Sequence, residues 1–268
     1  MSDECKHGFE RGFCDTCFPK AEFVPEPKET AKRVGRTRAP ARTPGTPKVA
    51  PASAKLPPFE AAELRLYHVT HISNLPEILS TGSLLADAAT PVIDISSAEN
   101  REARKSVFVA GQQDSPVSAF VPFFLSPDAA LWRSIRSGKS DARLASDVSG
   151  LSVNDFVVLV TTIGAVSLEG VGALANVVVA DGDAAGSLTP FAANSASAVR
   201  MLRKLRSDEE YDALLEAEVL VADSVPVDKI ALIGVANITV REKVKRMLAP
   251  TAYETKVAAY TPWFEAVE

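Results

Sequence analysis

The sequence predicts an α+β fold, with a mixed sheet core and flanking helices. Three observations lead to this prediction. Apolar runs of strand length recur along residues 59–268, and amphipathic or polar stretches of helical length separate some of them. The spacing between successive predicted strands is too uneven for regular doubly wound units. No glycine-rich phosphate loop follows a predicted strand. We therefore expect one globular domain at residues 59–268, with no internal repeat.

The first two elements have clear boundaries. Polar and apolar side chains alternate along residues 63–70, and the stretch is rich in β-forming residues, which predicts a strand. A short helix follows at residues 75–82. Asn74 is expected to cap it, Pro76 lies in its first turn, and Gly82 closes it.

The other elements follow from apolar runs, helical periodicity and Pro or Gly boundaries. We expect strands at residues 119–126, 155–163, 174–180, 216–226 and 229–236, and helices at residues 98–106, 127–138 and 239–248. Residues 196–215 are expected to be mostly helical.

The composition changes sharply before residue 59. Residues 20–58 are rich in Pro, Ala, Lys, Arg and Thr and contain almost no large apolar residues, so we expect a disordered linker. Residues 28–58 carry eight Lys/Arg and one Glu, a net charge of +7, whereas residues 59–268 carry eighteen basic and twenty-seven acidic residues, a net charge of −9. This basic arm predicts either contact with a nucleic acid backbone or a solubilising linker.

No apolar run is long enough to span a membrane, and no apolar stretch follows the first basic residues. These features predict a cytoplasmic protein that does not associate with membranes.

All three cysteines of the chain lie in residues 1–19, together with one of its three histidines. Cys5, His7, Cys14 and Cys17 form the pattern C-x-H-x6-C-x2-C, and soft nitrogen and sulfur ligands of this kind suit a tetrahedral zinc ion. Four protein ligands leave no open position, so we expect a structural Zn²⁺ module rather than a catalytic metal. The alternative is a tail with free thiols.

The other two histidines lie three residues apart on the first predicted strand. Successive side chains of a strand point to opposite faces, so His68 and His71 are not expected to share a metal ion. Either one faces a cleft while the other packs or caps the turn, or both are structural.

Three blocks of the sequence carry a family resemblance. LYHVTHISNLPEILSTGSLL resembles the opening motif of the DarT family, the single-stranded-DNA ADP-ribosyltransferase toxins. The stretch from ENREARKSVFV to FVPFFLSP is similar to the arginine-bearing helix and following strand of that family, and EAEVLVADSVPVDKI is similar to its catalytic strand. The resemblance covers most of residues 64–248 and implies an ADP-ribosyltransferase-like sheet core.

Site residues follow from the resemblance by matching position. It implies that Glu218 is the catalytic glutamate and that Glu216 replaces a usual glutamine. It also implies Arg104 as the active-site arginine, with Arg101 as the alternative. The implied contacts to NAD are His68, Thr70, Asn74, Phe123 and Phe124.

The implied chemistry suits these residue types. Cleavage of the bond between nicotinamide and ribose develops positive charge at the anomeric carbon, and a carboxylate that accepts from the ribose 2′-OH stabilises it. No metal is needed for this step, because nicotinamide leaves as a neutral molecule. The implied partners are single-stranded DNA and a macrodomain antitoxin.

Three departures from the family pattern keep other acceptors open. Leu125-Ser126-Pro127-Asp128 stands where the family has Cys-Pro-Arg after its strand, the segment at residues 207–218 is short and acidic, and the domain carries a net negative charge. The alternatives are transfer to protein or RNA, NAD hydrolysis, or a catalytically degenerate DNA-binding module.

Overall fold

The computed structural model describes residues 59–86, 90–109, 111, 115–167, 174, 176–207 and 211–266. The expected zinc ligands and the expected linker at residues 20–58 lie outside these ranges. Within them, no cluster of three or more His, Cys, Asp or Glu side chains is arranged to hold a metal ion. None of the described helices has the length and apolar character required to cross a membrane.

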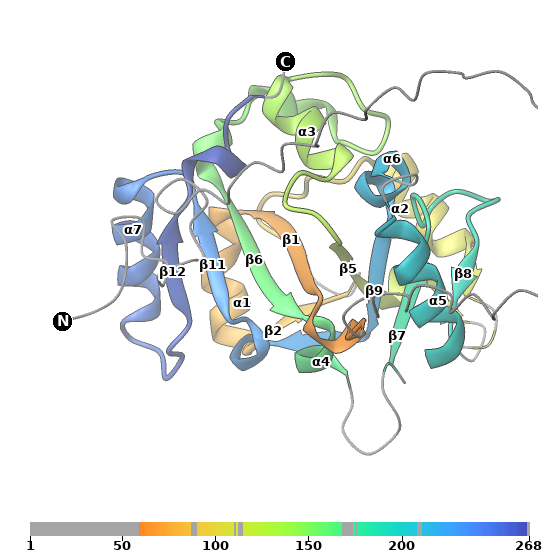
Figure 1. Cartoon of the computed structure of the whole chain (residues 1–268). Helices are drawn as coiled ribbons and strands as arrows, with labels where there is room; N and C mark the ends of the chain where they lie inside the picture. The colour runs from red at the N-terminus through yellow and green to blue at the C-terminus, as the bar shows by residue number, and fades with distance from the viewer. Residues whose placement is uncertain are drawn as a thin grey trace, which may run out of the picture.

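An eight-stranded sheet forms the centre of the described part of the chain, in the order β12-β11-β6-β1-β5-β9-β7-β8 (Figure 1). Neighbouring strands are antiparallel except β11 and β12. This arrangement confirms the predicted mixed α+β class. The strands are β1 (Arg65–His71), β5 (Phe120–Phe124), β6 (Phe156–Thr162), β7 (Val177–Ala180), β8 (Phe191–Ala192), β9 (Glu218–Ala222), β11 (Leu232–Val235) and β12 (Lys256–Ala259).

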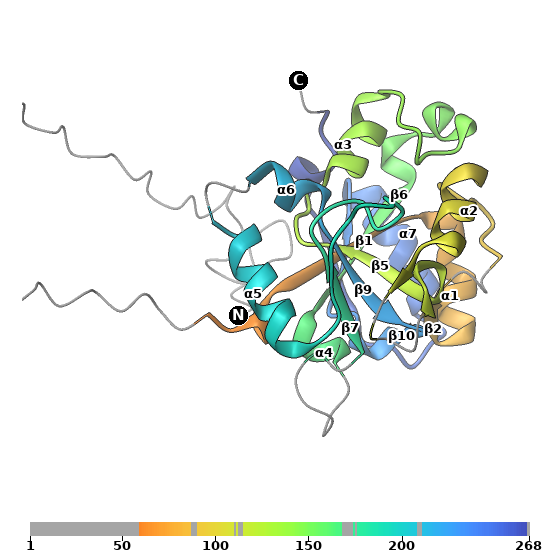
Figure 2. The ribbon, with the colours of Figure 1, turned by 90° about the vertical axis from the view of Figure 1, so that its right-hand side faces the viewer.

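Helices flank the sheet. Figure 1 shows α7 beside β12 at one end and α5 beside β7 and β8 at the other. Figure 2 shows α1 and α2 on the same side of β5 and β9, opposite α5. The helices are α1 (Leu75–Thr81), α2 (Ala98–Ser106), α3 (Ala130–Ser137), α4 (Ile163–Val166), α5 (Ser195–Leu205), α6 (Tyr211–Glu216) and α7 (Ile238–Leu248).

Two short ladders complete the described strands: β2 (Ser83–Leu85) with β10 (Ser224–Pro226), and β3 (Phe108–Val109) with β4 (Ser115–Pro116). The main core lies between the sheet and α1, α5 and α7, which bury leucines such as Leu75, Leu202 and Leu248. A second core packs Trp132 of α3 against Phe156.

The sheet opens between its two central strands. β1 pairs with β6 along its whole length, but it pairs with β5 at a single position, Tyr67 with Phe124. β5 in turn pairs with β9 over its full length, so the opening is local to the β1–β5 junction. Strands that diverge leave room for side chains and ligands, and this is where the candidate site lies.

Two sequence predictions need correction. The strand expected at residues 216–226 is interrupted at Asp223, whose φ of 62° is in the left-handed region, so the chain forms β9 and β10 instead. The helix expected from residue 127 begins at Ala130. By contrast, α1 ends at Gly82 with a φ of 76°, as its glycine C-cap predicts.

Candidate active site

A cavity of about 260 Å³ lies at the opening between β1 and β5. Its wall is built from α1, β2, the segment at residues 91–96, α2, the pocket side of β5, the loop after β7, and the start of β9. Side chains from segments far apart in the sequence therefore meet in one place.

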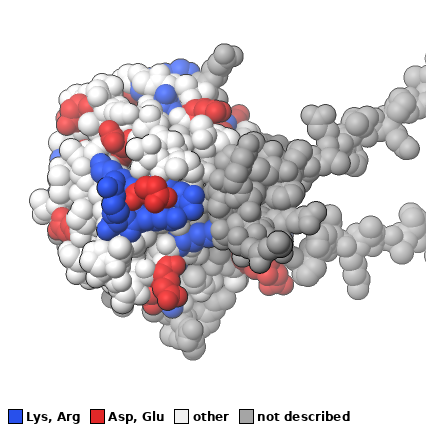
Figure 3. All heavy atoms as spheres, turned by 90° about the vertical axis from the view of Figure 1, so that its left-hand side faces the viewer, with Lys and Arg blue, Asp and Glu red and all other residues white. Residues whose placement is uncertain are grey.

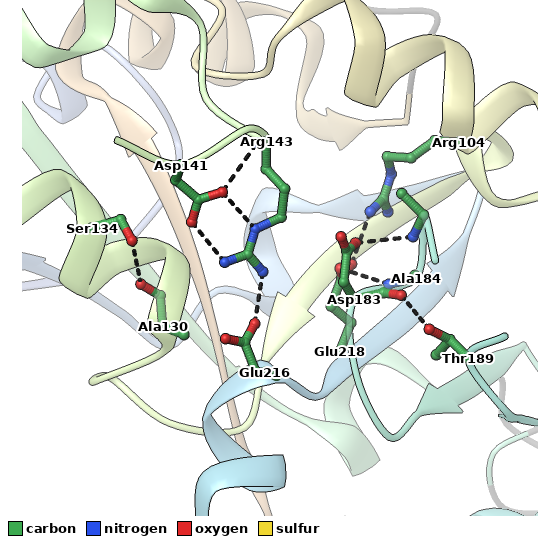
Figure 4. Close-up of polar contacts among 11 residues, drawn as sticks. Arg104, Ala130, Ser134, Asp141, Arg143, Asp183, Ala184, Thr189, Glu216 and Glu218 are labelled. Atoms are coloured by element: carbon green, nitrogen blue, oxygen red, sulfur yellow. Dashed lines mark hydrogen bonds and ion pairs between the residues drawn. The ribbon is translucent and has the colours of Figure 1, made fainter. Parts of the chain in front are cut away.

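Glu218 is the buried acid of this cavity. It is the first residue of β9, opposite Phe124 of β5, and its side chain is 6% exposed. Glu218 Oε1 accepts a hydrogen bond from the Ala184 amide at 3.1 Å, and Oε2 accepts one from Arg104 Nη1 at 3.0 Å (Figure 4). Both carboxylate oxygens are thus fixed by donors, which suits a negative charge in a buried place.

Arg104 lies in the last turn of α2, and its side chain is 12% exposed. Its Nη2 atom is buried and has no hydrogen-bond partner among the described residues. A buried, unpaired guanidinium donor is costly unless a ligand accepts from it. Arg104 therefore combines a fixed contact to Glu218 with an unused donor.

Arg101 also lines the cavity but has other partners. One turn before Arg104 on α2, it forms an ion pair with Asp94 and donates to the Ser96 carbonyl at 3.0 Å. Of the two arginines that the sequence offers, Arg104 is the one in contact with Glu218.

His68 lines the cavity from β1. Its Nδ1 lies 2.8 Å from the Pro122 carbonyl, and a carbonyl only accepts, so Nδ1 carries the hydrogen and Nε2 is the free acceptor of the neutral ring. Burial lowers the pKa of His68, and the charge of Arg104 lowers it further, although the hydrogen bond to Pro122 opposes both. The ring is therefore neutral at physiological pH.

His71 lies away from the cavity, as strand alternation predicts. Its Nδ1 accepts from the Ser73 amide at 3.2 Å, and its ring packs edge-on against Phe156 with 5.5 Å between centroids. It caps the turn at the end of β1 and has a structural role.

Thr70 and Asn74 both line the cavity, but they are bonded to the protein itself. Asn74 Nδ2 donates to Thr70 Oγ1 at 3.0 Å and to the Ile93 carbonyl at 2.9 Å, and Asn74 Oδ1 accepts from the Ile93 amide at 3.0 Å. The side chain of Asn74 makes no cap to α1, which corrects the sequence prediction. Asn74 instead ties the segment at residues 91–96 to β1 and so shapes the wall.

The two phenylalanines of β5 separate. Phe124 lines the cavity together with Pro122, whereas Phe123 is fully buried in the main core. The expectation that both rings line one pocket does not hold for Phe123, because neighbouring side chains of a strand point to opposite faces. Phe123 reaches the site only indirectly, through a ring contact with His68 at 5.6 Å between centroids.

Sequence reasoning missed a second charged cluster at the edge of the cavity. Arg143 donates to Asp141 through Nε and Nη2, at 3.0 and 2.7 Å, and to Glu216 through Nη1 at 2.7 Å (Figure 4). Burial opposes the charge of Arg143, but the hydrogen bonds to Asp141 and the charge of Glu216 outweigh it and raise its pKa. Each of the three side-chain nitrogens of Arg143 thus donates to a carboxylate of the protein.

The sequence prediction also missed Asp183 and Ala184, in the loop after β7. Asp183 lines the cavity, and the Ala184 amide holds Glu218. The signal was a polar Asp-Gly-Asp stretch directly after an apolar strand, at residues 181–183.

Comparison with known proteins finds a family match over most of the described domain. The family model of DarT, ssDNA thymidine ADP-ribosyltransferase, matches residues 67–265. No curated protein sequence matches the chain.

Several solved structures share the fold. Thermus sp. 2.9 DarT in complex with ADP-ribosylated ssDNA has a TM-score of 0.61 and 25% identity, covering 75% of this chain and 96% of its own. The same protein in complex with NAD+ has a TM-score of 0.59 and 24% identity, covering 75% and 97%. Thermosipho africanus DarTG in complex with ADP-ribose has a TM-score of 0.55 and 20% identity, covering 75% and 50%.

Proposed function

Because this chain belongs to the DarT family, we propose that its cavity holds NAD+ and that Glu218 and Arg104 direct ADP-ribose to a thymine of single-stranded DNA. Family membership makes the chain an NAD-dependent ADP-ribosyltransferase. The observation that carries the residue roles is the buried Arg104–Glu218 pair inside the cavity.

Glu218 is the proposed stabiliser of the transition state. As the bond between nicotinamide and ribose breaks, its electron pair leaves with the neutral nicotinamide and positive charge develops on the ribose. A carboxylate that accepts from a ribose hydroxyl counters this charge. Ala184 and Arg104 hold the Glu218 oxygens in advance, so little reorganisation is needed.

The proposed NAD contacts are Arg104, His68 and Phe124. Nη2 of Arg104 is a free donor for a diphosphate or hydroxyl oxygen, and Nε2 of neutral His68 is a free acceptor for a ribose hydroxyl. Phe124 offers an apolar surface to the nicotinamide ring. Thr70 and Asn74 act through the position of the cavity wall rather than through direct contact.

Contacts to the phosphates of the DNA are proposed at a basic surface on α7 and β12. Figure 3 shows Lys and Arg side chains gathered on this face of the molecule. Arg241, Lys245 and Lys256 line a surface hollow there, and Nε of Arg241 is buried without a partner in the described part of the chain. Such a surface attracts a polyanion locally even though the whole domain is acidic.

One observation favours a second candidate, transfer to protein or RNA. Glu216, which replaces the usual glutamine, lies at the cavity edge with its side chain 45% exposed and bonded to Arg143. A carboxylate at this place repels a phosphate backbone. A degenerate module that binds DNA without cleaving NAD+ is the third possibility, but the intact Arg104–Glu218 pair argues against it.

The proposal includes two features beyond the described domain. Cys5, His7, Cys14 and Cys17 are proposed to bind one structural Zn²⁺ in a module at residues 1–19, on the basis of ligand type and spacing alone. The other feature is the setting, a cytoplasmic toxin with a macrodomain antitoxin that removes its mark. Metal analysis of the purified chain tests the zinc, and the absence of bound zinc would refute it.

The function is tested by incubating the full chain with labelled NAD+ and one acceptor at a time. The acceptors are a single-stranded DNA oligonucleotide, an RNA oligonucleotide and a protein mixture. We expect label on thymine-containing single-stranded DNA. Label on RNA or protein, with DNA unlabelled, would establish the second candidate instead. Binding of DNA with no release of nicotinamide would establish the third.

A further inference from the structure

A second group of basic side chains lies on α5, at the opposite end of the sheet from the basic surface on α7 and β12 (Figure 1). Arg200, Arg203 and Lys204 are exposed on this helix, and exposed Arg206 is its C-terminal cap. The other side of α5 buries apolar residues such as Leu202 in the main core. The sequence of α5, SASAVRMLRKL, contains no acidic residue, so its outward side is purely basic.

The helix dipole accounts for only part of this charge. Cations in the last turn of a helix stabilise its partial negative charge, which explains Arg203 and Lys204. Arg200 lies before that turn, where the dipole gives no such benefit. Among the described residues, no ion pair joins Arg200, Arg203 or Arg206 to a carboxylate. The basic side of α5 is therefore not explained by contacts within the described part of the chain.

The positive charge continues from α5 to the start of β1. Arg65 is exposed at the first position of this strand. Burial raises the pKa of Tyr67, and the charges of Arg65 and Arg206 both oppose that change, so the two guanidinium groups lie near the same hydroxyl. We call this region the α5 surface, and it consists of Arg65, Arg200, Arg203, Lys204 and Arg206.

The basic arm joins the folded domain at the α5 surface. Phe59 is the first described residue, it packs against the main core, and the Arg203 guanidinium lies 5.2 Å from the centroid of its ring. Figure 2 shows the start of the described chain beside α5. The eight Lys/Arg and one Glu of residues 28–58 directly precede Phe59, and only Glu60 and Glu63 follow it before β1. Two strongly basic regions therefore meet at one place.

This meeting of like charges points to a polyanion as the partner. Two positive regions repel each other and together attract a ligand that carries many negative charges. Single-stranded DNA, on which the family acts, is such a ligand, with a phosphate at each nucleotide. A folded acidic protein fits less well, because protein interfaces have an apolar or aromatic centre. None of the exposed large apolar residues in the described ranges lies on α5.

The position of the cavity is consistent with a strand that reaches both basic surfaces. The cavity opens between β1 and β5, in the middle of the sheet, and β5, β9, β7 and β8 lead from it to α5. Neighbouring strands are about 4.8 Å apart, so this distance is roughly 15 Å. It corresponds to about five nucleotides at about 3.4 Å each. A bound strand therefore has one flank toward α5 and the other toward α7.

We propose that the α5 surface and the basic arm together bind one flank of the single-stranded DNA whose acceptor base enters the cavity. This inference rests on the proposed function. The cations contact phosphates and do not read the bases. They hold the strand near the cavity and so raise its local concentration, without touching the reacting atoms. The α5 surface should therefore affect KM for long DNA and leave kcat unchanged.

Arg200→Gln combined with Arg206→Gln tests the helix, since neither side chain lines the cavity. Two oligonucleotides each carry one thymine and a flank of about ten nucleotides, twice the distance to α5. The flank lies on the 5′ side of the thymine in one and on the 3′ side in the other. We expect KM to rise for only one of them, and its slope of log K against log salt to fall by about 1.4, from about 0.7 for each lost contact.

Arg33→Gln combined with Arg36→Gln and Arg38→Gln tests the arm in the full chain. We expect the same oligonucleotide to be affected and the other to be unchanged, because the arm begins beside α5. Lys139→Gln combined with Lys229→Gln is the matched control, which removes two exposed charges outside α5. This control should bind both oligonucleotides as the unaltered protein does, and KM for NAD+ should be unchanged in every variant.

Four results would overturn the proposal. They are equal slopes for the helix variant and the unaltered protein, an equal loss with both oligonucleotides, an equal loss in the control, and competition by polyglutamate as strong as that by DNA of the same charge. The last result would favour an acidic protein as the partner. If the unaltered protein labels neither oligonucleotide, the proposed function fails. DNA binding measured without NAD+ then still decides whether the α5 surface holds one flank.

Discussion

Two glutamates lie two residues apart, Glu216 at the end of α6 and Glu218 at the start of β9, and each is paired with an arginine. The two pairs differ in which arginine donors remain without a partner. Arg104 holds Glu218 in a nearly buried place and keeps one buried guanidinium nitrogen unpaired. Arg143 donates to Glu216 at the exposed edge of the cavity, and its other two nitrogens donate to Asp141. The pair inside the cavity therefore keeps an arginine nitrogen without a partner, whereas in the pair at the edge every arginine nitrogen has one.

This difference distinguishes a pair that can bind substrate from a pair that only supports the structure. A partly exposed ion pair whose arginine nitrogens all have partners contributes about 0–1 kcal/mol to stability and offers no donor to a ligand. A buried pair is costly to assemble, and breaking it leaves an uncompensated charge. The unpaired donor of Arg104 is thus best explained by a substrate that completes it.

The largest effect is expected for Glu218→Gln. The amide keeps the size of the side chain but removes the negative charge that counters the ribose cation. We expect kcat for ADP-ribose transfer to fall about 10²- to 10³-fold or more, with the fold intact by circular dichroism. Activity equal to that of the unaltered protein would refute the catalytic role of Glu218.

A smaller loss is expected for Arg104→Lys. Lysine keeps the charge near Glu218 but cannot supply two fixed nitrogens, so one charged hydrogen bond, about 1.5–3 kcal/mol, is lost. Such a loss corresponds to about a ten- to hundredfold decrease in kcat/KM for NAD+. Arg143→Lys is the matched control, and an equal decrease in that variant would erase the distinction between the two pairs.

The charge of Arg104 also acts on His68. The pKa of His68 is lowered in the folded protein, so the unfolded chain binds a proton more readily below the ordinary value of 6.5. The free energy of unfolding should therefore decrease as the pH falls through 6.5 toward the lowered pKa, and this decrease should be smaller in His68→Gln. Urea denaturation across pH 7.5 to 5 (roughly the titration range of histidine) measures it. Identical pH dependence in both proteins would argue against a buried neutral His68.

The basic surface gives a graded prediction. Arg241→Glu together with Lys245→Glu should weaken binding of long single-stranded DNA and reduce the slope of log K against log salt by about 0.7 for each lost phosphate contact. Lys139→Glu, an exposed change outside the hollow, is the control. If the double variant and the unaltered protein have equal slopes, this surface does not bind the DNA phosphates.

The smallest effect is expected for Glu216→Gln, which restores the residue type usual in the family. Arg143 keeps its two contacts to Asp141, so the change should cost about 0.2–1 kcal/mol at most. Transfer to single-stranded DNA should change little or increase. A marked loss would show that the edge pair takes part in catalysis and would favour a non-DNA acceptor.

Much of this arrangement could be predicted from the sequence. The apolar pattern and the Pro and Gly positions predicted the bounds of α1, α2 and β6 to within about a residue, including the glycine cap of α1. The family resemblance identified the strand that begins with Glu218. Strand alternation alone separated His68 from His71. The same rule applied to β5 would have removed Phe123 from the pocket.

The remainder depended on contacts distant in sequence. Asn74 carries every mark of a helix cap, yet a loop nineteen residues away competes successfully for its side chain. Arg143 meets Glu216 across 73 residues, and Ala184 meets Glu218 across 34. A local sequence pattern cannot predict these partners, because the tertiary fold decides which distant segments lie next to each other.

The single pairing position between β1 and β5 has a thermodynamic consequence. The two halves of the sheet share few backbone hydrogen bonds at this junction, so a molecule that contacts β1, β5 and β9 together links them. Ligand present at a hundred times its dissociation constant adds about 2.7 kcal/mol to the free energy of unfolding. NAD+ should accordingly raise the melting temperature, and backbone amides that border the opening should exchange their hydrogens more slowly when it is bound.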